Sequence, residues 1–288
     1  MAEELKNLVR AELAQSVDPR VTAMAAAIAG LYPAAARAVL FYGSCLRQSE
    51  LDGLMLDFYL IVSDYRDAYP GIWLTVANTL LPPNVFPFAQ DGLAAKYAVL
   101  SEADFARLNG PEAGDVSVWA RFAQPSRLVW AADETARAAA VAAVARAAPT
   151  LLSWAAPMTW DRDDPLAVWR QGFALTYASE LRAERKGRSE SVVDTDPERY
   201  ARFGAAAIAA PAPYAAKAWK RFRRRGKMLS LARLAKAATT FAGGADYLAW
   251  KINRHAGTQI EVRPWQRRWP ILGALILLPR LFLRGAIR

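Results

Sequence analysis

Residues 39–62 read VLFYGSCLRQSELDGLMLDFYLIV, and the stretch contains two apolar runs separated by a polar connection. Val39-Leu40-Phe41-Tyr42 ends at Gly43-Ser44, which predicts a buried strand followed by a turn. Residues 56–62 are rich in aromatic and branched side chains, which predicts a second strand. Asp57 lies inside this run, and a buried carboxylate is costly without a partner. We therefore expect Asp57 either to pair with an arginine or to bind a cation.

The rest of the chain mixes helical and strand-like segments. Residues 3–30 predict one or two helices and residues 70–81 a further helix, whereas residues 96–100 and 127–130 predict two more strands. From residue 133 to 182 the chain is rich in Ala, Leu and Trp without a strand-like run, which predicts a helical region. We expect its tryptophans to be core residues, namely Trp154, Trp160 and Trp169. The fold class predicted is α+β, with a mixed sheet followed by a mainly helical part.

The composition limits the possible chemistry. The chain has 288 residues, of which 54% are hydrophobic, so it can form a sizeable core. Cys45 is the only cysteine and His255 the only histidine. An intrachain disulfide and a cysteine zinc site are therefore excluded. Any metal has to be held by carboxylates, which favours a hard ion such as Mg²⁺.

The charge is distributed unevenly. The net charge is +10, with about +15 in residues 217–288 and about −5 in residues 1–216. Such an asymmetry indicates that one end meets a polyanion, either nucleic acid or an anionic bilayer. Residues 269–279 form an apolar run that is too short to cross a bilayer, which needs roughly 20 residues. Because arginines flank this run on both sides, we expect it to lie in the headgroup region.

The predicted order of strand, Gly-Ser turn and acid-bearing strand suits nucleotide chemistry. Backbone N–H groups at Gly43 and Ser44 can approach a phosphate closely, and the Ser44 hydroxyl can add a hydrogen bond. A carboxylate on the next strand, Asp57, can hold Mg²⁺ against the same phosphates. Asp52 precedes that strand and Asp64 follows it. The sequence thus predicts a metal-dependent nucleotidyltransferase site.

Several short runs, in order, resemble the mitochondrial-type phosphatidate cytidylyltransferases, the translocator maintenance proteins. The first is Tyr42-Gly43-Ser44-Cys45-Leu46-Arg47-Gln48, followed by Met55-Leu56-Asp57-Phe58 and Val62-Ser63-Asp64. The likeness continues at Lys96-Tyr97-Ala98-Val99-Leu100-Ser101, Trp119-Ala120-Arg121-Phe122-Ala123-Gln124-Pro125 and Tyr177-Ala178-Ser179-Glu180-Leu181-Arg182-Ala183-Glu184. Together these runs span roughly residues 40–185, and the ordered set is more specific than any single run.

The resemblance implies a CDP-diacylglycerol synthase, in a bacterial branch of the family. The reaction would convert CTP and phosphatidate to CDP-diacylglycerol and pyrophosphate with Mg²⁺. The implied architecture is a nucleotidyltransferase domain over residues 1–132, a winged-helix-like helical domain over 133–216 and a basic membrane-associating region over 217–288. The implied site residues are Gly43 and Ser44 for the CTP phosphates, Asp57 for the metal, Lys96 and Arg121 for phosphate charge, and Tyr177, Glu180 and Arg182 from the second domain.

One departure concerns the metal. The family carries two acids spaced as Asp-x-Asp on the second strand, and Met55 stands at the first of these positions here. Asp52 or Asp64 is therefore expected to supply the second carboxylate beside Asp57.

Two other functions remain open alongside the lipid enzyme. One is a nucleotidyltransferase acting on RNA, protein or a small molecule, and the other is a non-catalytic relative on a lipid surface. For the lipid enzyme we expect CTP, phosphatidate and an anionic membrane surface as partners, and no nucleic acid. The N-terminus lacks an apolar signal-like segment, so we expect a peripheral location on the cytoplasmic face of the inner membrane.

Overall fold

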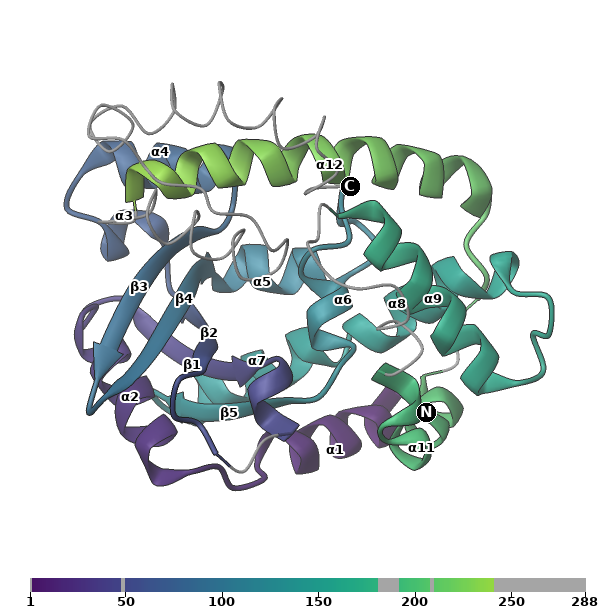
Figure 1. Ribbon diagram of the computed structural model, residues 1–288, viewed down its shortest axis with the longest axis horizontal. Coiled ribbons are helices and arrows are strands. Elements are labelled where there is room, and N and C mark those ends of the chain that lie inside the picture. Colours follow the sequence, from purple (N-terminus) through teal and green to yellow (C-terminus); the bar gives the residue numbers. More distant parts are fainter. Residues whose placement is uncertain (1, 48–49, 181–191, 208–209, 241–288) are drawn as a thin grey trace.

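A computed structural model describes residues 2–47, 50–180, 192–207 and 210–240. It is an α+β fold built on a mixed five-stranded sheet with the strand order β3-β4-β2-β1-β5 (Figure 1). β2 and β4 are parallel, and the other neighbours are antiparallel. The strands are β1 Ala36–Tyr42, β2 Met55–Val62, β3 Asn84–Gln90, β4 Leu93–Ser101 and β5 Ser126–Ala131.

Helices surround the sheet and follow it in the chain. Before and between the strands lie α1 Ala2–Leu13, α2 Pro19–Gly30, η1 Ser44–Arg47, α3 Tyr65–Ala68, α4 Ile72–Leu80, α5 Glu102–Asn109 and α6 Trp119–Phe122. After the sheet come α7 Glu134–Val144, α8 Ala147–Ala155, η2 Ala156–Met158, α9 Pro165–Ser179, α11 Pro197–Ala206 and α12 Ala215–Thr240. Several helices begin at an aspartate whose carboxylate accepts a hydrogen bond from the first turn, which satisfies otherwise unpaired N–H groups: Asp18, Asp133, Asp164 and Asp196.

The two faces of the sheet pack against different layers. Alternate side chains of β1 point to opposite faces, so Val39 and Phe41 join one hydrophobic cluster and Leu40 joins the other. The smaller cluster lies between the sheet and α2. The larger cluster continues from the sheet through α7, α8 and α9 to Trp219 and Phe222 of α12. Because this cluster includes residues on both sides of position 132, the helical part packs directly on the sheet.

Most elements predicted from the sequence are present. The four predicted strands correspond to β1, β2, β4 and β5, the helix predicted over 70–81 is α4, and the predicted helical region over 133–182 contains α7, α8 and α9. β3 was not predicted. One tryptophan prediction is wrong: Trp169 is fully buried and Trp154 is partly buried, but Trp160 is fully exposed. Residues 241–288, with most of the predicted membrane-associating tail, lie outside the described residues.

Within the described residues, the stretch Glu134–Met158 is long and apolar enough to cross a membrane by length and composition. It forms α7, α8 and η2, and 61% of its most apolar window is buried inside the fold. Burial of this kind is what a core helix shows.

Candidate functional site

The chain turns sharply at Gly43, directly after β1. Gly43 has a φ of +97°, a conformation that L side chains rarely adopt, and η1 begins at the next residue, Ser44. A Cβ placed on Gly43 would lie 3.3 Å from Oδ2 of Asp57. The Gly43-Ser44 turn therefore lies against the Asp57 carboxylate, and there is little room for a larger residue.

Three neighbouring strands bring the site together in one row across the sheet. The register pairs Tyr42 of β1 with Asp57 of β2, and Asp57 with Lys96 of β4. Side chains of paired residues emerge on the same face of a sheet. Lys96 Nζ lies 2.9 Å from Asp57 Oδ1, and both side chains are about three-quarters buried, with 26% and 22% exposed. The sequence analysis expected an arginine partner or a bound cation for Asp57, and the structure places a lysine there, from a strand distant in the chain.

Tyr42 borders the carboxylate on the β1 side. Its ring contacts those of Tyr59 and Phe122, with centroids 5.2 and 5.9 Å away. Burial raises the pKa of the Tyr42 hydroxyl well above its usual value, and the nearby Asp57 charge adds to the effect. Arg121 hydrogen-bonds this hydroxyl and partly offsets the rise in pKa. Tyr42 therefore links the carboxylate to the arginine and stays protonated.

Arg121 and Glu180 form an ion pair between α6 and the end of α9. Their charged atoms lie 3.1 Å apart, and only 8% of the Glu180 side chain is exposed. Burial opposes the charge of Arg121, but the carboxylate of Glu180 outweighs it and raises the pKa of Arg121 well above its usual value. Arg121 also donates to the backbone carbonyl of Ser117. The pair fixes a permanent cation beside Tyr42.

The other predicted site residues lie at different distances from this row. Tyr177 lies on α9 and packs against the larger hydrophobic cluster. Arg182 lies outside the described residues. Asp52 is exposed and pairs with Arg20 at 3.2 Å. Asp64 caps α3 by accepting a hydrogen bond from the N–H of Arg66.

The structure does not bring Asp64 to Asp57. The two acids lie seven residues apart, one near each end of extended β2, which corresponds to roughly 23 Å along the strand. No group of three His, Cys, Asp or Glu side chains with metal-binding geometry occurs among the described residues. Of the three acids expected to hold a metal, Asp57 is the one beside the Gly43-Ser44 turn.

Asp57 on its own still suits one kind of metal binding. Its buried Oδ1 makes no hydrogen bond of regular geometry, although Lys96 lies close to it. Mg²⁺ commonly binds one or two protein carboxylates, keeps several waters and takes its remaining ligands from substrate phosphates. The residues present therefore fit a magnesium ion that arrives with a nucleotide.

A charged cavity adjoins η1 on the β5 side. It measures about 280 Å³, and its lining includes Leu46 of η1, three arginines and two acids: Arg127, Arg199, Arg202, Glu12 and Asp196. Burial lowers the pKa of Arg127, and repulsion by Arg199 adds to this. Arg199 is held by a buried ion pair with Glu12 of α1. The sequence analysis did not single out Arg127, which lies opposite Phe41 in the antiparallel β1–β5 register and thus not in the row of Tyr42, Asp57 and Lys96.

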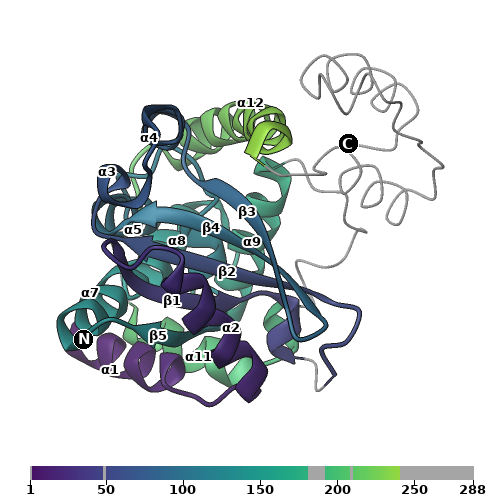
Figure 2. The same cartoon turned by 90° about the vertical axis from the view of Figure 1, so that its left-hand side faces the viewer.

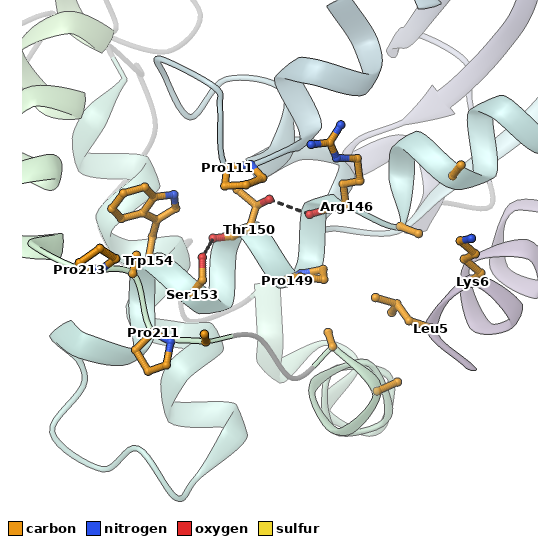
Figure 3. A pocket seen from close by; sticks show the side chains of 16 residues that line it. Leu5, Lys6, Pro111, Arg146, Pro149, Thr150, Ser153, Trp154, Pro211 and Pro213 are labelled. Carbon is orange, nitrogen blue, oxygen red and sulfur yellow. Dashed lines mark hydrogen bonds between the residues drawn. The ribbon is translucent and has the colours of Figure 1, made fainter. Parts of the chain in front are cut away.

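A larger cavity lies elsewhere and is apolar (Figure 3). It measures about 760 Å³ and is lined by residues of α1, α7 and α8, by Pro111, and by residues 206–207 and 210–213, so none of its lining residues lies in a strand. The hydroxyls of Thr150 and Ser153 in its wall donate to backbone carbonyls one turn earlier in α8. These two hydroxyls are thus engaged locally, and none of the residues that line the cavity belongs to the row at Asp57.

Comparison with known proteins gives no assignment. No protein-family model matches the chain, and no curated protein matches it.

Proposed function

We propose that this protein is a nucleotidyltransferase that transfers CMP from CTP to phosphatidate, giving CDP-diacylglycerol and pyrophosphate. The observation behind the proposal is the close approach of the Gly43-Ser44 turn to the Asp57 carboxylate, with Lys96 beside it. A phosphate-binding turn packed against a metal-binding carboxylate is what transfer of a nucleotide requires. The proposal includes a nucleotidyltransferase fold for the sheet and a winged-helix-like arrangement for the helical part.

The residues of the candidate site have the following roles in this reaction. Backbone N–H groups at Gly43 and Ser44, with the Ser44 hydroxyl, bind the CTP phosphates. Lys96 and Arg121 neutralise phosphate charge. Asp57 would hold Mg²⁺, which supplies further charge neutralisation at the phosphates when it is bound. Because the described residues bring one carboxylate to the turn, that of Asp57, the nucleotide itself would complete the coordination of the metal.

The transfer needs no protein base. An oxygen of the phosphatidate phosphate, already anionic, attacks the α-phosphorus of CTP, and the bond to the β-phosphate oxygen breaks to release pyrophosphate. Negative charge gathers on the leaving pyrophosphate, so fixed cations beside it stabilise the transition state. Arg121, whose charge is secured by Glu180, suits this task because it does not lose its proton at any physiological pH.

The lipid acceptor is supported by the charge distribution. α12 carries the nine basic residues between positions 217 and 236, which help to make the C-terminal part cationic, and most of those up to Lys227 are exposed. A peripheral location on the cytoplasmic face of an anionic membrane would place phosphatidate within reach. The same basic surface could serve an RNA acceptor, so the acceptor has to be tested directly.

The test is an incubation of the purified full chain with labelled CTP, Mg²⁺ and vesicles containing phosphatidate. The expected result is a labelled CDP-lipid and an equal amount of pyrophosphate, both abolished by Asp57→Asn. If no CDP-lipid forms while a known synthase works in the same vesicles, the lipid reaction is wrong. Label transferred to RNA instead would establish the alternative nucleotidyltransferase. Absence of transfer to any acceptor, together with a cellular role that Asp57→Ala leaves intact, would favour a non-catalytic lipid-surface protein.

A further inference from the structure

α4 presents an unusually apolar face to solvent. Ile72, Trp73, Val76 and Leu80 are 82%, 62%, 41% and 79% exposed, and their spacing places them on one side of the helix. α4 contains no charged residue. Single exposed hydrophobic residues are common, but a contiguous row of four marks a surface that meets something apolar.

The orientation of this face is fixed by the opposite side of α4. Asn78 is fully buried there, and its amide donates to the backbone carbonyl of Val99 in β4 at 3.0 Å. Its side-chain oxygen accepts from the backbone N–H of Asn84, at the start of β3. Rotating α4 to bury its apolar row would break these bonds, so the exposure follows from how the helix is anchored.

α12 runs beside α4 along the same edge of the molecule, at the top of both Figure 1 and Figure 2. Lys236 of α12 donates to the backbone carbonyls of Ala77 and Leu81 at the end of α4. Arg233, one turn earlier, donates to the carbonyl of Pro82 at 2.8 Å and pairs with Asp115. Lys236 thus joins the two helices directly, and Arg233 holds α12 to the segment that follows α4.

The outward face of α12 is cationic. Trp219, Phe222 and Gly226 mark its buried side. On the opposite side, at spacings of three and four, lie four exposed basic residues: Lys217, Lys220, Arg224 and Lys227. Within the described part of the chain none of these four forms an ion pair with a carboxylate. Met228, which follows this row toward α4, is 70% exposed.

We propose that α4 and α12 together form a docking surface for an anionic lipid bilayer, in which α4 inserts its apolar row among the acyl chains while the α12 lysines and arginines contact the headgroups. An apolar face beside a row of basic residues is the arrangement that binds at the membrane interface. This proposal rests on the lipid acceptor of the proposed function and adds the surface that contacts the membrane. Binding to the bilayer does not require the transfer reaction itself.

Other occupants fit the surface less well. A nucleic acid would match the charge of α12 but would leave the apolar row of α4 uncovered. A second copy would bring its own basic row against this one. Residues 241–288 carry eight basic and two acidic residues, so they too would be repelled by α12. The bilayer alone supplies both negative charge and an apolar interior.

The test is flotation of the full-length protein with vesicles of phosphatidylcholine alone or mixed with phosphatidylglycerol, without CTP. Binding is expected with the anionic vesicles and is expected to weaken with salt. Ile72→Ser and Leu80→Ser should each weaken it about tenfold or more, because each removes a large apolar group from the bilayer. Arg224→Gln and Lys227→Gln should each weaken it roughly fivefold. Leu31→Ser is the matched control, since Leu31 is a 54% exposed leucine after α2, and it should bind like the wild type.

Three results would overturn the proposal. One is unchanged vesicle binding by a double variant that combines Ile72→Ser with Leu80→Ser. Another is a change of oligomeric state in this double variant, measured by sedimentation, with no loss of lipid binding. The third is a loss of thermal stability in the double variant that disappears when residues 241–288 are deleted, which would make that segment the occupant. Because the assay contains no nucleotide, failure here is distinguishable from failure of the CTP reaction.

Discussion

Gly43 offers a direct test of the site, because Gly53, ten residues further along the chain, provides a matched control. Gly43→Ala places a methyl group 3.3 Å from Oδ2 of Asp57, closer than the ordinary van der Waals range of about 3.4–4 Å. Gly53 also has a positive φ, +72°, but a Cβ there has nothing within 4 Å. Gly53→Ala therefore imposes a similar backbone strain without touching Asp57.

The two substitutions should separate stability from activity. Forcing alanine to a positive φ costs roughly 1–2 kcal/mol, and restriction of the unfolded chain returns a few tenths of that, so both variants should lose about 1 kcal/mol in free energy of unfolding. Only Gly43→Ala displaces the carboxylate, by a few tenths of an ångström, while Lys96 still holds its other oxygen. A displacement near 1 Å can lower a rate about 100-fold, so the smaller one should lower kcat/KM for CTP about tenfold.

The assay is pyrophosphate release from CTP with phosphatidate vesicles, together with urea denaturation of both variants. Gly53→Ala should keep wild-type kcat/KM despite its lower stability. The reasoning is refuted if the two variants lose activity equally, since the loss would then come from strain alone. It is refuted as well if Gly43→Ala is fully active, because the turn then does not position the Asp57 carboxylate.

Three further predictions concern the charged groups. Asp57→Asn should lower CDP-lipid formation at least about 100-fold, whereas Lys96→Met should mainly raise the KM for CTP, as steady-state kinetics would reveal. Glu180→Gln should lower the free energy of unfolding by roughly 2–3 kcal/mol in urea denaturation, because it leaves the mostly buried Arg121 guanidinium without its counter-charge. Burial, with Arg233 nearby, lowers the pKa of Lys236 to about 7; the unfolded chain then binds more protons above that pH. Stability should therefore rise as the pH increases from about 7 to 9, by less than about 1.4 kcal/mol per pH unit because the ammonium is only partly buried, and Lys236→Met should flatten this rise.

Elements with a clear local signal could be predicted from the sequence, and β3 shows why one could not. Its residues, NVFPFAQ, include Pro87, and a proline inside an apolar run argues against a central strand. The strand order places β3 at the edge of the sheet, where the missing backbone N–H of Pro87 is tolerated. β3 was missed because its position at the edge of the sheet cannot be read from a local sequence pattern.

The candidate site likewise contains features that a local sequence pattern predicts and features that depend on how distant segments pair. The Gly43-Ser44 turn and the buried Asp57 follow from neighbouring residues, so the sequence indicated them. The identity of the Asp57 partner depends on β2 pairing in parallel with β4, which brings in Lys96 from 39 positions later. Asp64 failed to reach the site for a related reason: β2 continues as an extended strand from Asp57 to Val62, which carries Asp64 away from the turn. Spacing along the chain cannot distinguish a turn from an extended strand unless the strand length is known.

α12 relates the candidate site to the proposed membrane surface. Gly226 packs against the backbone carbonyl of Ser179 at the end of α9, next to the Glu180–Arg121 pair, and a side chain at position 226 would collide there. Lys236 contacts α4 ten residues further on, which is about 15 Å along a helix. A bilayer resting on the outer face of α12 would therefore lie at a distance from Arg121 that this single helix sets. An enzyme that takes its acceptor from a membrane needs such a fixed distance, because its catalytic cations have to reach a phosphate whose depth the bilayer determines.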